Sequence, residues 1–232
     1  MQYKIWLEQQ LKDYNAVITN SHLVLTSGKH SDSYINLRVL AGKTNVLYEI
    51  GGMISRAIKE REAEIKDSIS DDRRNKIILV GPETLGRTLV EFTAIAGHFD
   101  FVWCDMKKDN DGNDFAGWNP KLNFPETVKR ARCYIVDDLL TTAKSVKLTQ
   151  RLIEKTGGKV EGVVVVARRS EKVTAEFIGV PWLYSLLDIS CFNTWKADKE
   201  EPCPLCEADV PMKLRPGHGH EWINEHPGYP TC

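Results

Sequence analysis

Apolar residues recur with two different spacings along the first 190 residues, one typical of helices and one typical of buried strands. Helical spacing extends over residues 3–15, 46–65, 88–96 and 145–155. Short continuous apolar runs lie at residues 76–80, 101–104, 134–136 and 160–167. Continuous runs suit strands that are buried on both faces, as in a parallel sheet. The alternation therefore predicts an α/β fold with a mainly parallel sheet flanked by helices.

Three segments interrupt this alternation. Residues 21–38 contain two short strand-like runs around a polar loop with Gly28. Residues 105–123 are polar, rich in Gly, Asn and Asp and without periodicity, which predicts a long loop that is either functional or disordered. From residue 191 onward Pro, Gly, His and Trp are frequent, which indicates a C-terminal extension and not a second α/β domain.

The overall composition is that of an ordinary globular protein. The 232 residues are 42% hydrophobic and 27% charged, and the formal net charge is -1. The Lys and Arg clusters are too short to form a nucleic-acid track, and no apolar run is long enough to span a bilayer. The N-terminus lacks the layout of a signal peptide. We therefore expect a cytoplasmic protein with no nucleic-acid or membrane partner.

The most informative motif is a strand-like run that ends in two acids, Asp137 and Asp138, and leads through a hydroxylated loop into a helix. Ligands of open α/β sheets bind beyond the carboxyl ends of the strands, and a helix N-terminus suits a phosphate. Two carboxylates suit sugar hydroxyls or a divalent cation. The combination predicts a site for a phosphorylated sugar, the alternative being an ordinary strand–loop–helix with a Thr or Ser cap.

The run YIVDDLLTTAKS resembles the phosphoribosyl-diphosphate-binding motif of type I phosphoribosyltransferases. This resemblance implies that Asp137 and Asp138 bind the ribose hydroxyls. It also implies that the 5′-phosphate is bound by Thr141, Thr142, Ala143, Lys144 and Ser145. The family usually has Gly where this chain has Ala143, and Lys144 is larger than usual.

A second segment, ILVGPETLGRTL, resembles the diphosphate loop of the same family, in which exposed backbone N–H groups bind an anion. The residues concerned are Gly81, Pro82, Glu83, Thr84, Gly86 and Arg87. Orotate enzymes often have Tyr-Lys before the second Gly. Here Thr84 and Leu85 occupy these positions, and Arg87 is placed to supply the missing charge. A plain Gly-Pro turn is the alternative.

A third segment, LVLTSGKHSDSYINLR, resembles the N-terminal signature of orotate phosphoribosyltransferases, a hairpin that closes over the base. It implies base-binding roles for Ser27, Lys29 and Tyr34. Arg169 matches the arginine that pairs with the orotate carboxylate through its bidentate fork. A surface hairpin and a solvated arginine are the corresponding alternatives.

The polar segment after Cys104 lies where the family has its mobile catalytic loop, which closes over diphosphate, often from the neighbouring subunit. Lys107 and Lys108 match the catalytic lysines of that loop, although its usual His is missing. A solvated charged loop is the alternative.

The resemblance thus implies a type I phosphoribosyltransferase fold with a domain over residues 1–190, made of a hood (1–45) and a core (46–190), and an extension over 191–232. The implied enzyme transfers ribose 5-phosphate from phosphoribosyl diphosphate to orotate, with Mg²⁺, in a homodimer with shared active sites. Transfer to another base, and a non-catalytic regulator that binds phosphoribosyl diphosphate, are the rival interpretations.

The cysteines indicate a reducing compartment, because only two of the six lie close to each other in the sequence. Cys203 and Cys206 form a single CxxC in the extension. This motif is either half of a zinc site, completed by His218, His220 or Cys191, or a reduced structural or redox pair. A similar tail occurs in a subset of orotate phosphoribosyltransferases.

Overall fold

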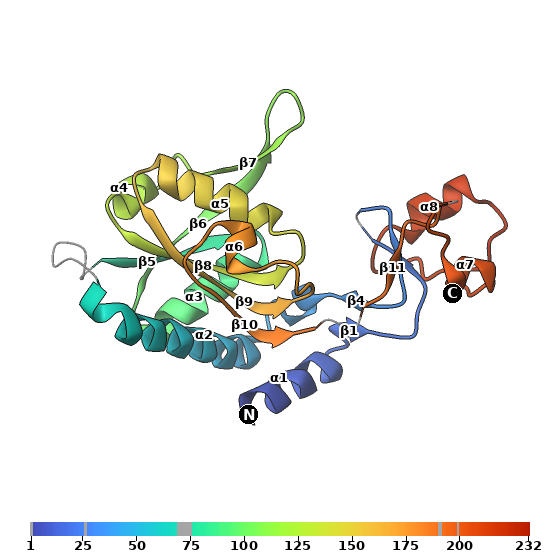
Figure 1. The fold of residues 1–232 in the computed structure, drawn as a ribbon, viewed down its shortest axis with the longest axis horizontal. Coiled ribbons are helices and arrows are strands. Elements are labelled where there is room, and N and C mark those ends of the chain that lie inside the picture. The colour runs from blue at the N-terminus through green and yellow to red at the C-terminus, as the bar shows by residue number, and fades with distance from the viewer. Residues whose placement is uncertain (1, 26, 69–75, 190–191, 199) are drawn as a thin grey trace. The chain divides into compact units, whose positions relative to one another are not determined.

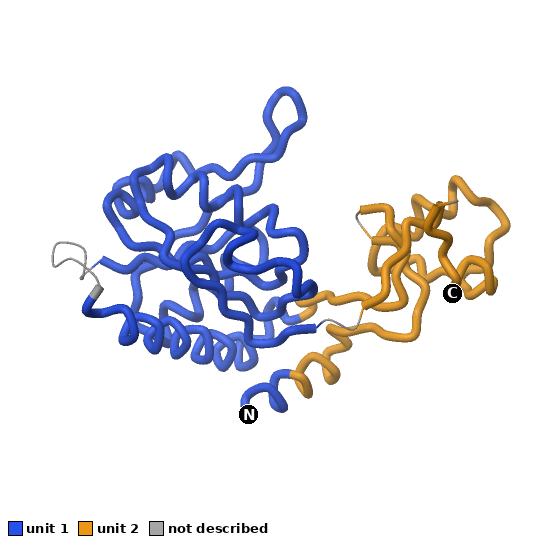
Figure 2. The backbone as a smooth tube through the Cα atoms, in the orientation of Figure 1, with its two compact units in different colours: residues 1–7, 40–190 blue, residues 8–39, 191–232 orange. Residues whose placement is uncertain are grey.

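The structure is a computed structural model that describes residues 2–25, 27–68, 76–189, 192–198 and 200–232. The chain forms two compact units (Figure 2). Unit 1 comprises residues 1–7 and 40–190, and unit 2 comprises residues 8–39 and 191–232. This division differs from the predicted one, because the C-terminal extension joins the N-terminal hairpin in a single unit.

Unit 1 is built on a six-stranded sheet with the order β10-β9-β8-β5-β6-β7. All neighbouring strands are parallel except β6 and β7, which confirms the predicted mainly parallel sheet. The strands are β5 (Ile77–Pro82), β6 (Asp100–Lys108), β7 (Asp114–Gly117), β8 (Arg132–Leu140), β9 (Lys159–Arg168) and β10 (Leu183–Asp188).

Helices cover both faces of this sheet (Figure 1). On one face lie α2 (Thr44–Ile65) and α3 (Leu85–Gly97). On the other lie α4 (Phe124–Val128), α5 (Lys144–Lys155) and α6 (Ala175–Ile178). Side chains alternate across a strand, so Cys133 and Ile135 of β8 face the second layer and pack in one core with Val146 and Ile153 of α5. Tyr134 and Val136, between and beside them, are also fully buried, which explains the continuous apolar run in the sequence.

Unit 2 contains short strands and helices from both ends of the chain. Strand β1 (Val17–Ile18) pairs with β4 (Tyr34–Ile35), and a second sheet has the order β11-β3-β2. In that sheet β2 (Leu23–Val24) and β3 (His30–Ser31) form the predicted hairpin, and β11 (Thr194–Trp195) adds to it from the extension. The helical elements are α1 (Gln2–Asp13), which begins in unit 1, η1 (Leu37–Leu40), which ends there, α7 (Pro204–Glu207) and α8 (Gly219–Glu225). A short η2 (Lys66–Ser68) follows α2 in unit 1.

The prediction of an irregular loop over residues 105–123 was wrong for half of that segment. Strand β6 continues to Lys108, and the chain turns back as β7, with Lys108 opposite Asp114. The side chain of Asp109 holds the turn by accepting the N–H groups of Asp111 and Asn113. The hairpin is polar, so its strands carry none of the apolar periodicity that would have predicted them.

Among the residues that the structure describes, no helix combines the length and the apolar character needed to cross a bilayer.

Candidate active site

The topology of the sheet predicts a ligand site at the carboxyl ends of β5 and β8. In chain order, the first parallel strand (β5) lies between the second (β6) and the third (β8), so the strand order reverses at this point. Open α/β sheets bind ligands outside the carboxyl ends of the strands at such a switch point, because the connections diverge there and leave a crevice. The two loops singled out in the sequence begin at these two strand ends.

The acidic pair, Asp137 and Asp138, lies near the carboxyl end of β8. One carboxylate oxygen of Asp137 accepts the backbone N–H of Asp138 at 2.9 Å, and the other accepts the Ser145 hydroxyl at 2.9 Å. Asp137 is only 5% exposed, and burial, followed by the charge of Asp138, raises the pKa of Asp137 well above its usual value. A buried acid beside a second acid favours a ligand that brings hydroxyl donors or positive charge.

Residues 141–145 lead from the end of β8 into the first turn of α5. Ala143 stands at the N-cap of α5 in the left-handed conformation (φ 61°, ψ 17°) and offers no side-chain oxygen to the N–H groups of the first turn. These N–H groups, with the positive end of the helix dipole, suit an anion. A hollow of about 350 Å³ lies here, lined by Met106, Asp114, Leu139, Leu148 and residues 141–145.

The loop after β5 packs directly against the acidic pair. A Cβ atom at Gly86 would lie 3.1 Å from the carboxylate of Asp137, and one at Gly81 would lie 2.4 Å from the carbonyl oxygen of Gly86. Close approach of the backbone therefore requires glycine at position 81, and at position 86 any side chain would press against the acidic pair. The Glu83–Thr84 peptide bond, which is cis, and the exposed residues Glu83 and Thr84 form the outer part of this loop.

The two lysines of the β6–β7 hairpin each pair with an acid of the same hairpin. Lys107 pairs with Asp105 at 3.5 Å and Lys108 pairs with Asp114 at 3.2 Å. Asp114 also forms an ion pair with Lys144 and lines the hollow beside residues 141–145. Asp114 thus links Lys108 of the hairpin to Lys144 at the start of α5, beside the hollow.

Arg169 follows β9, and its backbone N–H donates to the carbonyl of Leu140 at 2.9 Å. It therefore lies beside the start of residues 141–145.

In unit 2, Ser27, Gly28 and Lys29 form the turn of the β2–β3 hairpin, with Gly28 at φ 76°, and Tyr34 lies in β4. Ser27 is exposed, whereas Lys29 and Tyr34 are half-buried.

Comparison with known proteins identifies the family to which this chain belongs. The family model described as "Phosphoribosyl transferase domain" matches residues 50–185, which include the acidic pair, both loops and Arg169. The chain belongs to the phosphoribosyl transferase domain family. It is therefore an enzyme of the glycosyltransferase type, as predicted.

Curated members of the family are identical to this chain at between a quarter and a third of the aligned positions. The orotate phosphoribosyltransferase of Caldanaerobacter subterraneus is 27% identical over 202 residues, which cover 87% of this chain and 90% of that protein. The one from Pyrococcus furiosus is 30% identical over 154 residues, 65% of this chain and 73% of that protein. The crystal structure of the Aeropyrum pernix enzyme has a TM-score of 0.57 at 22% identity, covering 79% of this chain and 93% of that one, and supports the fold.

The side chain of Arg87, predicted to supply positive charge to diphosphate, contacts other protein side chains in this phosphoribosyltransferase. Its guanidinium lies 4.1 Å from the centre of the Trp103 ring and 3.4 Å from the carboxylate of Glu91. The charge of Arg87 is thus directed toward the side chains of α3 and β6. A role in binding diphosphate, which stays a prediction, would require Arg87 to leave these contacts.

The extension of this phosphoribosyltransferase contributes Cys203 and Cys206 to a cluster with His22 and His30. Neither histidine was predicted from the sequence as a ligand; the predicted further ligands were His218, His220 and Cys191. His218 lies 3.5 Å from the carboxylate of Glu221, His220 is exposed, and Cys191 lies outside the described residues. The one available signal was a pair of histidines eight residues apart on either side of a hairpin turn.

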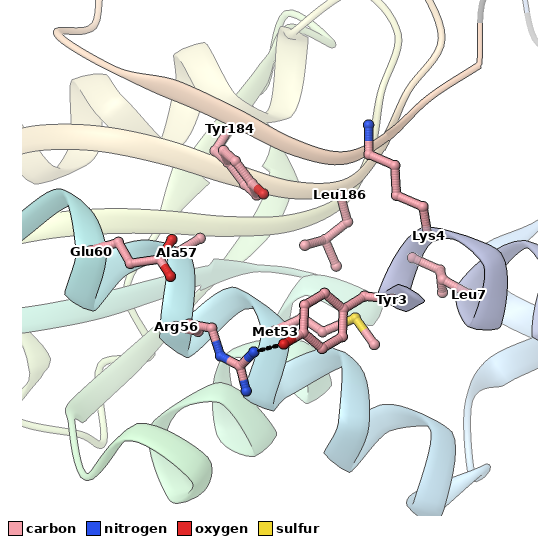
Figure 3. Close-up of a pocket in the computed structure, with 9 residues that line it drawn as sticks. All are labelled: Tyr3, Lys4, Leu7, Met53, Arg56, Ala57, Glu60, Tyr184 and Leu186. Carbon is pink, nitrogen blue, oxygen red and sulfur yellow. Dashed lines mark hydrogen bonds between the residues drawn. The ribbon is translucent and has the colours of Figure 1, made fainter. Parts of the chain in front are cut away.

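A second cavity, of about 150 Å³, lies between α1, α2 and β10 (Figure 3). The Tyr3 hydroxyl accepts a hydrogen bond from Arg56 beside it, and Leu7, Met53 and Leu186 supply apolar walls. It shares no lining residue with the hollow at residues 141–145. It also lacks the paired acids and glycine loop of the switch-point crevice, so we regard that crevice as the active-site candidate.

Proposed function

We propose that this enzyme transfers the 5-phosphoribosyl group of phosphoribosyl diphosphate to orotate, giving orotidine 5′-phosphate and diphosphate. The observation that carries the proposal is the placement of Asp137 and Asp138 between an uncapped helix N-terminus and a glycine loop at the switch point of the sheet. One ligand that needs two anion sites and a polyol site in a row is phosphoribosyl diphosphate. The curated relatives named above favour orotate as the acceptor.

Each part of the site has a task in this reaction. The bond from C1′ of the ribose to diphosphate breaks, and its electron pair leaves with diphosphate. A ring nitrogen of the base forms the new bond to C1′ and gives up its proton to water or to the departing diphosphate. Positive charge develops on the ribose, beside the carboxylates of Asp137 and Asp138. Negative charge grows on diphosphate, which the backbone N–H groups of residues 84–86 and the side chains of Lys107 and Lys108 would stabilise.

The donor set at this edge fits Mg²⁺, because carboxylate oxygens are hard ligands and Asp137 is a buried acid whose nearest ionisable neighbour is another acid. Asp137 and Asp138 would hold the ion together with the substrate. When bound with phosphoribosyl diphosphate, Mg²⁺ supplies positive charge that stabilises the departing diphosphate.

Steady-state assays with phosphoribosyl diphosphate and a panel of bases test the proposal. Orotate, uracil, adenine, guanine and hypoxanthine are compared by diphosphate release and by chromatographic identification of the nucleotide. We expect orotate to have the highest kcat/KM. A higher value for another base would support the rival acceptor, and binding of phosphoribosyl diphosphate without turnover on any base would indicate a regulator.

Arg169 tests the base side of the proposal. Arg169→Ala should raise the KM for orotate much more than the KM for phosphoribosyl diphosphate, because only the base loses a charge-assisted partner. The loss of binding free energy for orotate should be about 1.5–3 kcal/mol. Arg151→Ala, on the exposed side of α5, is the control. Equal effects on the two substrates would remove Arg169 from the base pocket.

Three further assignments remain proposals: base binding by Ser27, Lys29 and Tyr34, a homodimer with shared active sites, and a cytoplasmic location.

A further inference from the structure

Four potential metal ligands converge inside unit 2. They are the side chains of His22, His30, Cys203 and Cys206, whose ligand atoms all lie within 4.8 Å of one another. Both histidines and Cys203 are buried, and Cys206 is half-buried. Two ligands come from the hairpin near the N-terminus and two from the extension, more than 170 residues later in the sequence.

Four of the six distances between the ligand atoms are close to those of a tetrahedral site. Zinc bonds of about 2.0–2.1 Å to nitrogen and about 2.3 Å to sulfur give tetrahedral edges of about 3.3 Å between two nitrogens and about 3.6 Å between nitrogen and sulfur. Here His22 Nε2 lies 2.9 Å from His30 Nδ1, 3.7 Å from Cys203 Sγ and 3.6 Å from Cys206 Sγ. Cys206 Sγ lies 3.2 Å from His30 Nδ1. The remaining two distances are at most 4.8 Å, so movements on the order of 1 Å or less would bring all four atoms onto one ion.

Hydrogen bonds alone do not account for this convergence. The Nδ1 atom of His22 lies 2.8 Å from the carbonyl oxygen of Val210, which can only accept, so Nδ1 carries the proton and Nε2 presents a lone pair. One lone pair accepts one well-directed hydrogen bond, yet three atoms surround it. A cation at the centre would engage all four inward-facing atoms at once.

We propose that His22, His30, Cys203 and Cys206 bind one structural Zn²⁺ ion. Thiolate and imidazole ligands in tetrahedral arrangement favour zinc over magnesium or calcium. Four protein ligands leave no open position, so the ion holds the structure together and does not activate water. Two thiolates balance its charge, which allows a buried site with no net charge. The proposal is independent of the reaction catalysed in unit 1.

The surroundings of the cluster support a structural role. The carbonyl of Val210, which orients His22, also accepts the Tyr229 hydroxyl at 3.0 Å, an arrangement typical of the groups that orient metal-binding histidines. The backbone N–H of Lys213 donates to the carbonyl of His22 at 2.8 Å, so backbone bonds already join extension and hairpin at this point. The indole ring of Trp222 packs against His30 with ring centres 5.0 Å apart.

The small apolar core of unit 2 also favours stabilisation by a metal ion. Its two sheets consist of strands of two residues, and few large apolar side chains are buried within it, among them Leu23, Val24 and Met212. Small units with a thin core commonly depend on a metal or disulfides for stability. The described cysteines are free thiols, so the ion would take the place of a disulfide in linking two distant segments.

Metal analysis of tag-free protein tests the proposal. Wild-type protein expressed with zinc and dialysed should contain one zinc per chain by plasma mass spectrometry. Cys206→Ser and His22→Asn should retain less than about a tenth of it, because each removes a ligand on which folding and metal binding jointly depend. The matched controls are Cys232→Ser and His220→Asn, both at exposed positions outside the cluster, which should keep full occupancy. Wild-type protein without zinc, or equal loss in ligand and control variants, would overturn the proposal.

A measurement on the wild-type protein keeps the test valid if the ligand variants fail to fold. Protein produced with Co²⁺ in place of zinc should show the intense visible bands of tetrahedral cobalt and the near-ultraviolet charge transfer of cobalt thiolates. Weak bands typical of octahedral cobalt would contradict the site. An intact mass that corresponds to a Cys203–Cys206 disulfide in the freshly purified protein would do the same.

Discussion

Asp137 is a buried acid with its oxygens already bound to Asp138 N–H and Ser145, and it faces a second acid. If the pair binds ribose hydroxyls, Asp137→Asn with Asp138→Asn should abolish turnover. The free energy of unfolding should be equal or higher in the variant, because no buried acid then has to ionise beside a second negative charge. Activity assays and thermal unfolding measure the two effects. Asp100→Asn, at the opposite end of the sheet, is the control.

The same pair predicts a pH dependence. Burial, and then the charge of Asp138, raise the pKa of Asp137 above the ordinary 3.8, so the folded, ligand-free protein keeps a proton that the unfolded chain loses. Stability from this group is full below pH 3.8 and declines as pH rises through the raised pKa. Thermal unfolding across this range should show the decline in wild-type protein and not in the double Asn variant. Parallel curves for the two proteins would assign the pH dependence to other groups.

Ala143 gives a second prediction at this scale. A left-handed Ala costs about 1–2 kcal/mol. Ala143→Gly removes that cost but adds about 0.4–1 kcal/mol of unfolded-state entropy and loses about 0.8 kcal/mol of methyl burial. The three contributions nearly cancel, so stability in urea should change by less than about 1 kcal/mol. Ala143→Val should lose about 2–4 kcal/mol, because a branched side chain suits neither the conformation nor the packed site. A stable Val variant would show that the loop relaxes.

At the scale of elements, the β6–β7 hairpin carries the predicted catalytic lysines. If Lys107 and Lys108 meet diphosphate mainly in the transition state, replacing both with Ala should lower kcat by more than it raises the KM for phosphoribosyl diphosphate. Lys121→Ala, an exposed lysine beyond β7, should leave both constants unchanged. A rise in KM with unchanged kcat would assign the lysines to ground-state binding.

Elements with a strong apolar signal could be predicted from the sequence, and those without one could not. Strands β5, β8 and β9 are buried on both faces, and the amphipathic helices α2 and α5 pack on them, so their residues had to be apolar at fixed spacings. The β6–β7 hairpin is held by backbone bonds and by Asp109, which leave no periodic trace. The Cys/His cluster joins segments from both ends of the chain, and no local pattern reports which distant side chains meet.

At the scale of the whole molecule, the predicted homodimer with shared sites gives a complementation test. The Lys107→Ala, Lys108→Ala variant and the Asp137→Asn, Asp138→Asn variant are each expected to be inactive or nearly so. If subunits lend each other the hairpin, a hybrid dimer has one site with both defects and one with neither. Mixing should then restore up to about half of the wild-type activity per hybrid. Hybrids that native mass spectrometry detects but that stay inactive would show that each subunit uses its own hairpin.

Unit 2 is assembled from residues 8–39 and 191–232, with the whole parallel sheet between them in the sequence. On the ribosome, the N-terminal hairpin is therefore made early and must wait for strands that are made last. At about 5–20 residues per second, the extension alone takes roughly 2–8 seconds to synthesise. During that interval Leu23 and Val24, buried in the finished protein, have no partner from the extension. A nascent chain that stalls after β10 could thus fold its sheet while displaying an unfinished hairpin to chaperones and proteases.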